Sequence, residues 1–401
     1  MNAAAQSREP LRWTIQTQLP VAYEIVETPG LLDPANPELL RLPEGGSSTQ
    51  VRLVVLDHSI DELYGERIRT YFDANSVPVS YLCMPGDEES KSIGHVLDVV
   101  TKLNEVGTNR LSSPPIVIGG GVLADVVGLA ASLYRRGIPY IRVPTTLLGQ
   151  VDVSVAAKTG INFGGYRNRL GSYSPPPRTL IDREFLATVP HRQIRNGMGE
   201  ILKMALIKDL RLFELLEEHG ADLVEARFQD TGGALLPSGI ADEVIGRAIA
   251  GMAEELQPNL WEKDLQRSVD YGHSFSPLVE MRALPELLHG EAVAMECVFS
   301  AVLAAQRGLI TGADLERISA ATVRLGLRPS HPLFCDVDLL SEALADTVRH
   351  RDGRQNLPIL TRIGAVCFLN DLSVAEIASA AGYMGRLLDP APRPATPAVI
   401  G

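Results

Sequence analysis

The first half of the chain alternates short apolar runs with longer segments of helical periodicity. Apolar side chains at consecutive positions are typical of strands that are buried on both faces of a parallel sheet. Residues 60–74 and 91–106 instead repeat apolar side chains at the spacing of an amphipathic helix. This alternation predicts an α/β fold, in which helices cover both faces of a parallel sheet. The apolar runs lie at residues 51–57, 77–83, 115–118, 140–148 and 179–182.

The stretch before the first of these runs has a different pattern. Residues 13–17 and 21–26 alternate apolar and polar side chains, which predicts a β-hairpin across Leu19-Pro20. Residues 1–10 are small and polar, and we expect them to be frayed. The stretch 29–48 is rich in Pro and Gly, which predicts a surface loop.

Helical periodicity dominates after about residue 190, which predicts two domains. We expect an α/β domain at 1–190 and an all-α domain at 191–388. Residues 389–401 are rich in proline, which cannot continue a helix, and predict a disordered tail. The helical segments of the second domain are expected at residues 193–219, 241–255, 285–308, 313–325, 338–350 and 374–388.

Length and composition agree with an ordinary globular protein of two domains. The chain has 401 residues, of which 45% are hydrophobic and 21% charged. A net charge of −12 argues against general nucleic-acid binding, although it does not exclude a local basic pocket for a phosphate. No apolar run reaches membrane-spanning length and no N-terminal signal pattern is present, so we expect no membrane partner. The cysteines form no CxxC pair, which predicts reduced thiols and a cytoplasmic protein.

Gly119-Gly120-Gly121 directly follows an apolar run and precedes a helical segment. Glycines at such a position let the backbone approach a pyrophosphate, which then meets the N–H groups of the helix. The run differs from the dinucleotide pattern GxGxxG, so a simple tight turn between strand and helix is an equal alternative at this point. Thr145 and Thr146 end another apolar run, at the sheet edge where ligands bind in parallel sheets.

Three side chains from separate segments form a candidate metal site, namely Glu200, His273 and His289. One carboxylate and two imidazoles suit a divalent ion with positions left open for substrate, although such residues also occur as satisfied core or surface groups. A polar segment at 152–169 carries basic side chains that either clamp a phosphate or form a solvated loop. These basic side chains are Lys158, Arg167 and Arg169.

Six motifs together resemble a known family. In chain order they read GGGVLADVVG, VPTTLLGQVDVSVAAKTGIN, YRNRLGSY, NGMGEILK, GHSF and HGEAVAM. This order resembles the sugar phosphate cyclases, the family of 3-dehydroquinate synthase, over about residues 50–370. The resemblance implies a Rossmann-like NAD-binding domain, a helical domain with a catalytic zinc or cobalt ion, and an active site in the cleft between them. It also implies a small sugar phosphate as substrate and a homodimer.

The resemblance implies roles for individual residues. Glu200, His273 and His289 match the metal ligands. The positions that match the polar active-site residues are Lys158, Lys203, Asp152, Arg136, Arg167 and Asn168, with Arg167 at a place where 3-dehydroquinate synthases usually have lysine. The positions that match the NAD site are Asp57, Glu88, Lys91, Gly120, Gly121, Val122, Asp125, Thr145, Thr146, Leu148, Asp152, Lys158, Arg167, Phe185 and Thr188.

Three positions depart from 3-dehydroquinate synthase, which has Lys, Arg and Asn around its substrate carboxylate. They are Met252, Gln266 and Asp270 here, so two cations are lost and one anion is gained. An anion beside a substrate carboxylate is repelled in a low-dielectric cleft. We therefore predict a substrate that ends in a neutral hydroxymethyl group, whose proton Asp270 and Gln266 accept. Pro277 also replaces a histidine of that enzyme.

Met252, Asp270 and Pro277, with the local sequences PNLWEKD and GHSFSP, resemble the sedoheptulose 7-phosphate cyclases. Members of that group make 2-epi-5-epi-valiolone, its epimer 2-epi-valiolone, or desmethyl-4-deoxygadusol. The implied reaction is transient oxidation by NAD, elimination of phosphate, reduction and an intramolecular aldol closure, in the biosynthesis of natural products. Gln266 fits neither subgroup, so the product epimer stays open. The alternatives are a 3-dehydroquinate synthase, a desmethyl-4-deoxygadusol synthase, or a metal- and NAD-dependent alcohol dehydrogenase.

Overall fold

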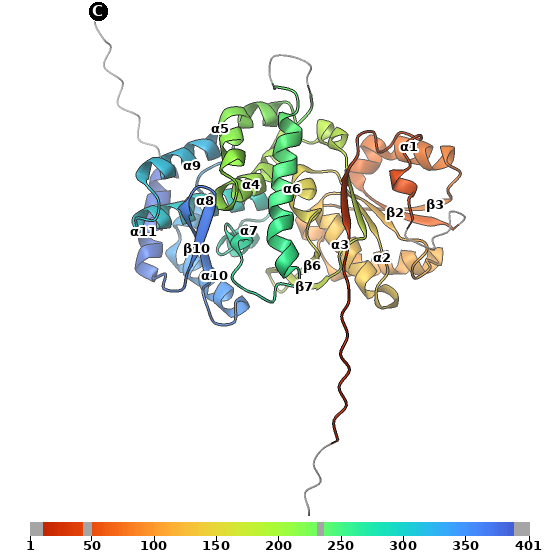
Figure 1. Ribbon diagram of the computed structural model, residues 1–401, viewed down its shortest axis with the longest axis horizontal. Coiled ribbons are helices and arrows are strands. Elements are labelled where there is room, and N and C mark those ends of the chain that lie inside the picture. Colours follow the sequence, from red (N-terminus) through yellow and green to blue (C-terminus); the bar gives the residue numbers. More distant parts are fainter. Residues whose placement is uncertain (1–10, 43–49, 231–235, 389–401) are drawn as a thin grey trace, which may run out of the picture.

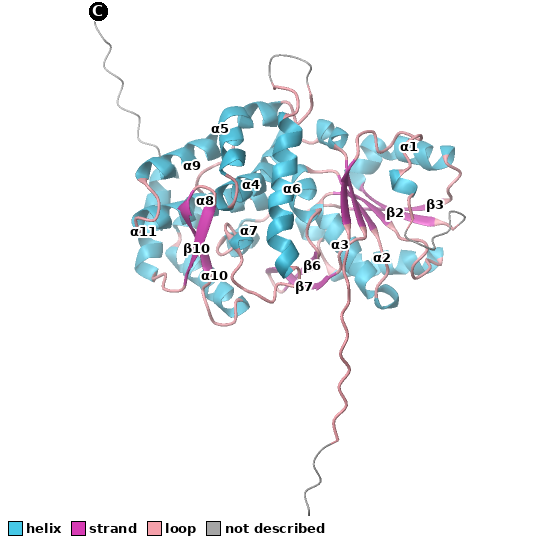
Figure 2. Cartoon of the chain, in the orientation of Figure 1, coloured by secondary structure: helices cyan, strands magenta, loops and turns pink. Residues whose placement is uncertain are grey.

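The computed structural model describes residues 11–42, 50–230 and 236–388, so the predicted frayed end (1–10) and proline-rich tail (389–401) lie outside the described residues. The N-terminal part is an α/β domain around a six-stranded sheet in which all paired strands run parallel, as predicted (Figures 1 and 2). The strands are, in spatial order, β1 (Glu24–Glu27), β8 (Arg178–Ile181), β5 (Ile141–Pro144), β4 (Ile116–Gly119), β2 (Arg52–Asp57) and β3 (Val79–Met84).

Two apolar cores cover the faces of this sheet. Alternate side chains of β2 point to opposite faces, so Val54 and Leu56 pack with α1 (His58–Ala74). Leu53 and Val55 pack on the other face, with α2 (Ile93–Val106) and α3 (Gly121–Leu133). Asp57, the last residue of β2, caps α1 because its carboxylate accepts the Ser59 N–H at 2.8 Å.

The polar segment that was expected to be a loop forms an antiparallel hairpin. Its strands are β6 (Lys158–Phe163) and β7 (Tyr166–Tyr173), which pair around Gly164 and Gly165. Both glycines have positive φ, at +61° and +79°, which the two-residue turn requires and which other residues rarely adopt. The hairpin packs on α3 and extends the α/β domain toward the helical one (Figure 1).

The C-terminal domain is built around α8 (His289–Gln306), which is buried over most of its length. The expected helix at 193–219 is two helices, because Asp209 caps a new helix by accepting the Leu212 N–H at 3.0 Å. The expected boundary at residue 190 stays a prediction; the first helix after it begins at His191. The other helices of the domain are α4 (His191–Ile207), α5 (Leu210–Glu225), α6 (Ile240–Leu256), α7 (Ser276–Ala283), α9 (Gly312–Arg324), α10 (Val337–His350) and α11 (Val374–Leu388).

The C-terminal domain is helical, as predicted, except that β9 (Leu357–Arg362) and β10 (Ala365–Leu369) form an antiparallel pair, so it is not all-α. Two predictions about the N-terminal part are wrong. No hairpin forms across Leu19-Pro20, because β1 pairs with β8 in the sheet and leaves residues 11–23 extended. The stretch 29–48 is not all surface loop: Leu31, Leu32 and Leu39 are buried against α1, while residues 43–49 lie outside the described residues. Among the described residues, no helix is both long and apolar enough to cross a membrane.

Candidate active site

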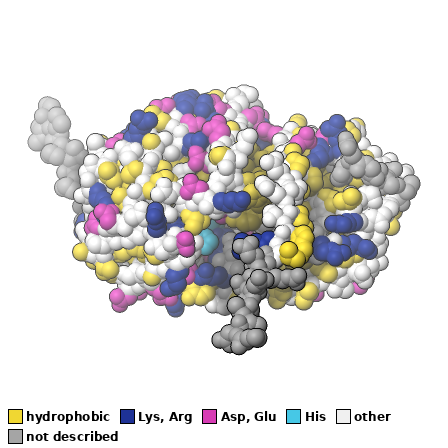
Figure 3. Space-filling model, turned by 60° about the horizontal axis from the view of Figure 1, so that its bottom comes forward, with side chains coloured by type: hydrophobic (Ala, Val, Ile, Leu, Met, Phe, Trp, Pro, Cys, Tyr) yellow, Lys and Arg dark blue, Asp and Glu magenta, His cyan; other side chains and the backbone are white. Residues whose placement is uncertain are grey.

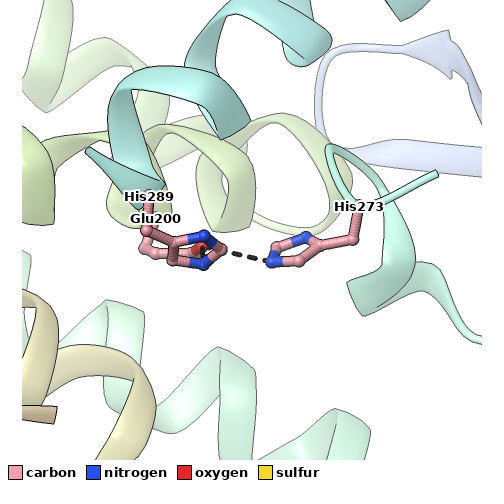
Figure 4. A group of neighbouring side chains, drawn as sticks. All are labelled: Glu200, His273 and His289. Atoms are coloured by element: carbon pink, nitrogen blue, oxygen red, sulfur yellow. Dashed lines mark ion pairs between the residues drawn. The ribbon is translucent and has the colours of Figure 1, made fainter. Parts of the chain in front are cut away.

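Glu200, His273 and His289 lie together, as predicted, although they come from three separate elements (Figure 4). Glu200 is on α4, His289 is the first residue of α8, and His273 lies in the turn before α7. The Nε2 atoms of His273 and His289 are 3.4 and 3.2 Å from the same oxygen, Glu200 Oε1. Burial and the Lys203 ammonium lower the pKa of His273, so its imidazole is neutral and able to bind a metal.

Glycines bring the ligands of this triad into reach. A Cβ on Gly199 would lie 2.1 Å from the carbonyl oxygen of Gly290, and a Cβ on Gly290 would lie 1.8 Å from that of Asn196. The backbones of α4 and α8 therefore touch, and the Asn196 side chain accepts the Gly290 N–H at 2.6 Å. This contact sets Glu200, next to Gly199, opposite His289, next to Gly290.

Glu280 orients His289 from behind. Its Oε2 atom is 3.0 Å from His289 Nδ1, and this contact orients the ring so that Nε2 faces Glu200. Burial favours the neutral acid, but Arg167 and His289 outweigh it and lower the pKa of Glu280 to about 2. Arg167 Nη1 lies 3.2 Å from the same carboxylate, so one buried acid holds both a ligand and a basic side chain.

Replacing Glu280 with Gln is expected to destabilise the metal-free protein in a pH-dependent way. Because folding lowers this pKa from 4.5 to about 2, the contribution is present above pH 4.5 and is lost as the pH falls toward 2. The shift corresponds to about 3 kcal/mol at neutral pH and roughly half of that at pH 3. Urea unfolding of both proteins at pH 6 and pH 3 measures this difference.

The control for this prediction is Glu105→Gln, which changes an exposed carboxylate on α2. It should alter the free energy of unfolding by less than about 0.5 kcal/mol at both pH values. A Glu280→Gln difference that does not change between pH 6 and pH 3 would contradict an ionised, paired Glu280.

The chemistry of the triad fits a divalent cation. Lys203 Nζ lies 2.6 Å from Glu200 Oε2, and both side chains are almost fully buried. Within the described part of the chain, neither oxygen of Glu200 accepts a well-oriented hydrogen bond. A buried carboxylate in that state is costly, and a cation between it and the two imidazole nitrogens would satisfy it. The carboxylate stays ionised, because Lys203 and His273 overcome burial and hold its pKa well below the usual value.

A cavity of about 500 Å³ opens beside the triad, between the β6–β7 hairpin and the helical domain. His273 lines it, and Lys158, Arg167 and Asn168 line it from the hairpin, as the resemblance implied. Arg136 does not line it, since it lies exposed at the end of the helical turn after α3. Lys203 is buried beside Glu200, and half-buried Asp152 lies close enough to act on its charge. Figure 3 shows Lys and Arg side chains gathered near a histidine at the middle of one face.

The structure contradicts the charge argument drawn from the three departing positions. Asp270 does line the cavity, but Met252 is buried in the helical core and Gln266 is exposed, with its amide 3.5 Å from Asn356 Oδ1. Asp270 is not a lone anion either, because it pairs with Arg267 and with Arg351, the latter at 3.2 Å. Burial opposes its ionisation, but these guanidinium groups prevail and lower its pKa.

The glycine turn is built to receive a phosphate. Helix α3 begins at Gly121 without any side-chain cap, so its first N–H groups are free to bind a ligand. A Cβ on Gly121 would lie 2.9 Å from Val153 Cγ2, which explains the glycine there. Thr146 lies beside Gly120, 3.5 Å from where a Cβ would be. Asp57 ends β2, and Gly120 and Thr145 directly follow β4 and β5, so all three lie at the carboxyl edge of the sheet, where dinucleotides bind in such folds.

A polar network joins this edge to the hairpin. Lys91 Nζ lies 2.6 Å from both Asp125 Oδ2 and Asn168 Oδ1, and Glu88 pairs with Arg167 at 3.4 Å. Burial favours the protonated acid, but Arg167 and Lys91 lower the pKa of Glu88. The other positions implied for NAD surround the same edge: Val122 in the first turn of α3, Leu148 beside Gly121, Phe185 against Tyr64, and Thr188 at 3.0 Å from the Tyr64 hydroxyl.

Comparison with known proteins decides the family. Models described as the N-terminal and C-terminal parts of 3-dehydroquinate synthase match residues 81–196 and 197–350. A 2-epi-5-epi-valiolone synthase of Streptomyces albus is 49% identical over 377 residues, 94% of this chain and 91% of the relative. The chain belongs to the sugar phosphate cyclases, the family of 3-dehydroquinate synthase.

Two further members of this family are similar. The structure of ValA, a 2-epi-5-epi-valiolone synthase from Streptomyces hygroscopicus with NAD+ and Zn2+ bound, is 47% identical and superposes with a TM-score of 0.87, over 93% of this chain and 99% of ValA. A demethyl-4-deoxygadusol synthase of Trichormus variabilis is 36% identical, over 90% of this chain and 87% of the relative.

Several residues at the site of this cyclase were not predicted from the sequence. Arg267 lies three residues before Asp270, a spacing that brings two side chains together across one helical turn, so this pair could have been predicted from the sequence. Glu262 pairs with Lys158 at 2.7 Å, and Arg351 comes from the end of α10. No local pattern predicts these last two contacts, because they join segments that only the fold brings together. Glu280 was missed for the same reason.

Proposed function

We propose that this cyclase converts sedoheptulose 7-phosphate into a seven-carbon valiolone-type cyclitol, either 2-epi-5-epi-valiolone or its epimer 2-epi-valiolone. The observation that carries the proposal is that His273, one member of the Glu200–His273–His289 triad, lines the same cavity as the basic side chains of the hairpin. Relatives named 2-epi-5-epi-valiolone synthase are 47–49% identical over most of the chain. The demethyl-4-deoxygadusol alternative is less favoured, at 36% identity.

The proposed cofactors are NAD and a divalent ion such as zinc or cobalt. The glycine turn, Thr145, Thr146 and Asp57 would hold NAD, and the triad would hold the ion. When bound, NAD would accept and return a hydride and the ion would polarise the hydroxyl oxygens in front of it. Support comes from the uncapped helix α3, from the unsatisfied Glu200 carboxylate, and from the NAD+ and Zn2+ bound to ValA.

The chain's own side chains would then bind and orient the sugar. Lys158 and Arg167 supply positive charge for the phosphate, which leaves as a dianion, and the Asn168 amide adds hydrogen bonds. Burial alone would lower the pKa of Arg167, but the Glu280 and Glu88 carboxylates outweigh burial and raise this pKa above its usual value. The guanidinium therefore stays charged. A cavity of this size would also hold the seven-carbon chain folded, which would make the aldol closure effectively unimolecular.

Lys203 would hold a hydroxyl of the substrate next to the triad. Burial lowers its pKa, but Glu200 and Asp152 raise it above the usual value, so Nζ remains a proton donor. At the other end of the cavity, each cation is already matched: Arg267 by Asp270 and Glu262, and Arg351 by Asp270. A neutral hydroxymethyl end suits such a balanced group better than the carboxylate that 3-dehydroquinate synthase binds.

The test is a reaction of purified protein with NAD, Co2+ or Zn2+, and sedoheptulose 7-phosphate. We expect one inorganic phosphate released per cyclitol formed, no net NADH absorbance, and an NMR spectrum of the product that distinguishes the two epimers. Steady NADH formation from a simple alcohol would instead indicate a dehydrogenase. Turnover of the substrate of 3-dehydroquinate synthase, with none of sedoheptulose 7-phosphate, would refute the proposal.

We also propose that two copies of the chain associate through residues 11–19, as a cytoplasmic homodimer that serves natural-product biosynthesis. Leu11, Trp13, Ile15 and Leu19 alternate with polar residues, and each is at least 80% exposed. The segment leaves the body as an extended trace (Figure 1). Antiparallel pairing of two such segments about Ile15 would set Leu11 opposite Leu19 and bury one apolar face. The free cysteines agree with a reducing compartment.

The double variant Trp13→Glu, Ile15→Glu is expected to weaken dimerisation at least about 100-fold, because two apolar side chains contribute about 3 kcal/mol or more when buried. Light scattering after size-exclusion chromatography at several concentrations measures this change. Gln16→Glu adds a charge on the opposite face of the same segment and should leave the dimer intact. Equal dissociation constants for the double variant and the native chain would contradict pairing through this segment.

A further inference from the structure

Glu296 is a carboxylate that the proposed reaction does not use, although it lies close to the triad. It is on α8 and is fully buried. Its Oε1 accepts the N–H of Ser274 at 2.7 Å, and its Oε2 accepts those of Phe275 and Ser276 at 2.8 and 2.5 Å. Successive N–H groups that converge in this way form an anion-binding concavity. The turn they belong to is the one that carries His273.

No ion pair within the described residues explains a buried acid there, although the Arg351 charge also favours its ionised form. Among the described residues, no side-chain cation lies within hydrogen-bonding distance of Glu296. Burial raises its pKa to about 7, although the three backbone N–H groups favour the charged form. Burying an acid in such a position costs stability, so we expect it to make a contribution that an apolar side chain could not make. The task visible in the structure is to grip the backbone from Ser274 to Ser276.

Helix α8 therefore controls both histidines of the triad. His289 is its first residue, and Glu296 lies seven residues further, two turns along on the same face and about 10 Å away along the axis. The helix presents His289 directly and holds His273 through the turn. Ser276 Oγ closes that turn by donating to the Gly272 carbonyl at 2.6 Å, and Gly272 has a φ of +79°, a conformation other residues rarely adopt.

We propose that Glu296 is a positioning residue, which fixes the distance between His273 and His289 and so sets the affinity of the site for a divalent metal. The inference rests on the proposed metal site and adds a residue that acts on it through the backbone. A carboxylate suits this role because it only accepts hydrogen bonds. A glutamine in its place would turn an NH2 donor toward at least one backbone N–H donor.

The test compares Glu296→Gln and Glu296→Asp with the native protein, each stripped of metal with a chelator. Co2+ is then titrated by its visible absorption, and near-ultraviolet circular dichroism and NAD affinity report on the fold. We expect Glu296→Gln to weaken Co2+ binding about 10- to 100-fold, the usual effect of removing a group that orients a ligand. Glu296→Asp, which keeps the charge but draws it back, should fall between Gln and Glu.

Ser300→Ala is the matched control, because Ser300 is a buried polar residue one turn further along α8 and its hydroxyl has no partner among the described residues. It should bind Co2+ like the native protein. Equal Co2+ affinity in Glu296→Gln and the native protein would overturn the inference, and so would loss of the folded circular dichroism signal in both Glu296 variants. A native protein that binds no Co2+ would instead overturn the metal site itself.

Discussion

Replacing His273 with alanine is expected to lower turnover at least about 1000-fold and to abolish metal binding, while the fold remains. The triad would lose one of its two imidazoles, and a divalent ion that polarises the substrate contributes several kcal/mol, with each 1.4 kcal/mol a factor of ten in rate. His273 is half-buried at the cavity wall, so its removal leaves no large void in the core. Metal content by mass spectrometry, product NMR and thermal unfolding measure the three quantities.

His191→Ala is the control for this variant, since His191 starts α4, does not line the cavity, and has its ring beside Glu225 at the end of α5. It should retain metal and turnover close to those of the native chain. If His273→Ala kept one metal ion per chain and more than about a tenth of the native rate, the triad would not be the metal site.

The second large effect is expected from Gly290→Ala. The new Cβ would lie 1.8 Å from the Asn196 carbonyl oxygen, so α4 and α8 must move apart at the point where their backbones touch. Overpacking against backbone typically costs about 3 kcal/mol or more, since no side chain can rotate away. The same movement separates His289 from Glu200, so metal affinity should fall along with the free energy of unfolding. Urea unfolding and Co2+ titration of the same sample test both.

Gly246→Ala is the control for this variant, because the same substitution is expected to stabilise the protein there. Gly246 lies inside α6, and a Cβ there would meet nothing within 4 Å. Alanine should therefore stabilise the protein by up to about 1 kcal/mol through higher helix propensity. If Gly290→Ala were as stable as Gly246→Ala, the close contact between the two helices would not exist in solution.

The sheet and most helices could be predicted because each has a pattern within its own residues. The strands β2 and β4 read as continuous apolar runs because both faces of the sheet are covered. The pair β9 and β10 was not predicted: β10 is apolar throughout, but β9 contains Pro358, a residue that is rare inside strands. The prediction of an N-terminal hairpin was wrong because alternation indicates a strand but not the strand with which it pairs. The partner of β1 is β8.

The residues of the site could be predicted from the sequence, but the balance of charge around Asp270 could not. The ligands and the glycine turn belong to motifs, so each could be placed by resemblance. The charge balance depends on Arg351, which the fold brings from the end of α10 to Asp270. Counting charge at three positions was therefore misleading, since Met252 and Gln266 do not line the cavity. Asp270 is also balanced by Arg267 and Arg351.

The stretch from Gln257 to Asp270 has only one buried residue, Asp270, and is tied down by ion pairs of Glu262 and Arg267. It forms one wall of the cavity, yet it contains no ligand of the triad and no part of the glycine turn. In the proposed reaction, the residues that contact the far end of the sugar and those that hold the metal and NAD would therefore lie in different parts of the chain. Substitutions in this segment could therefore change the substrate during evolution while the metal ligands and the glycine turn stay the same.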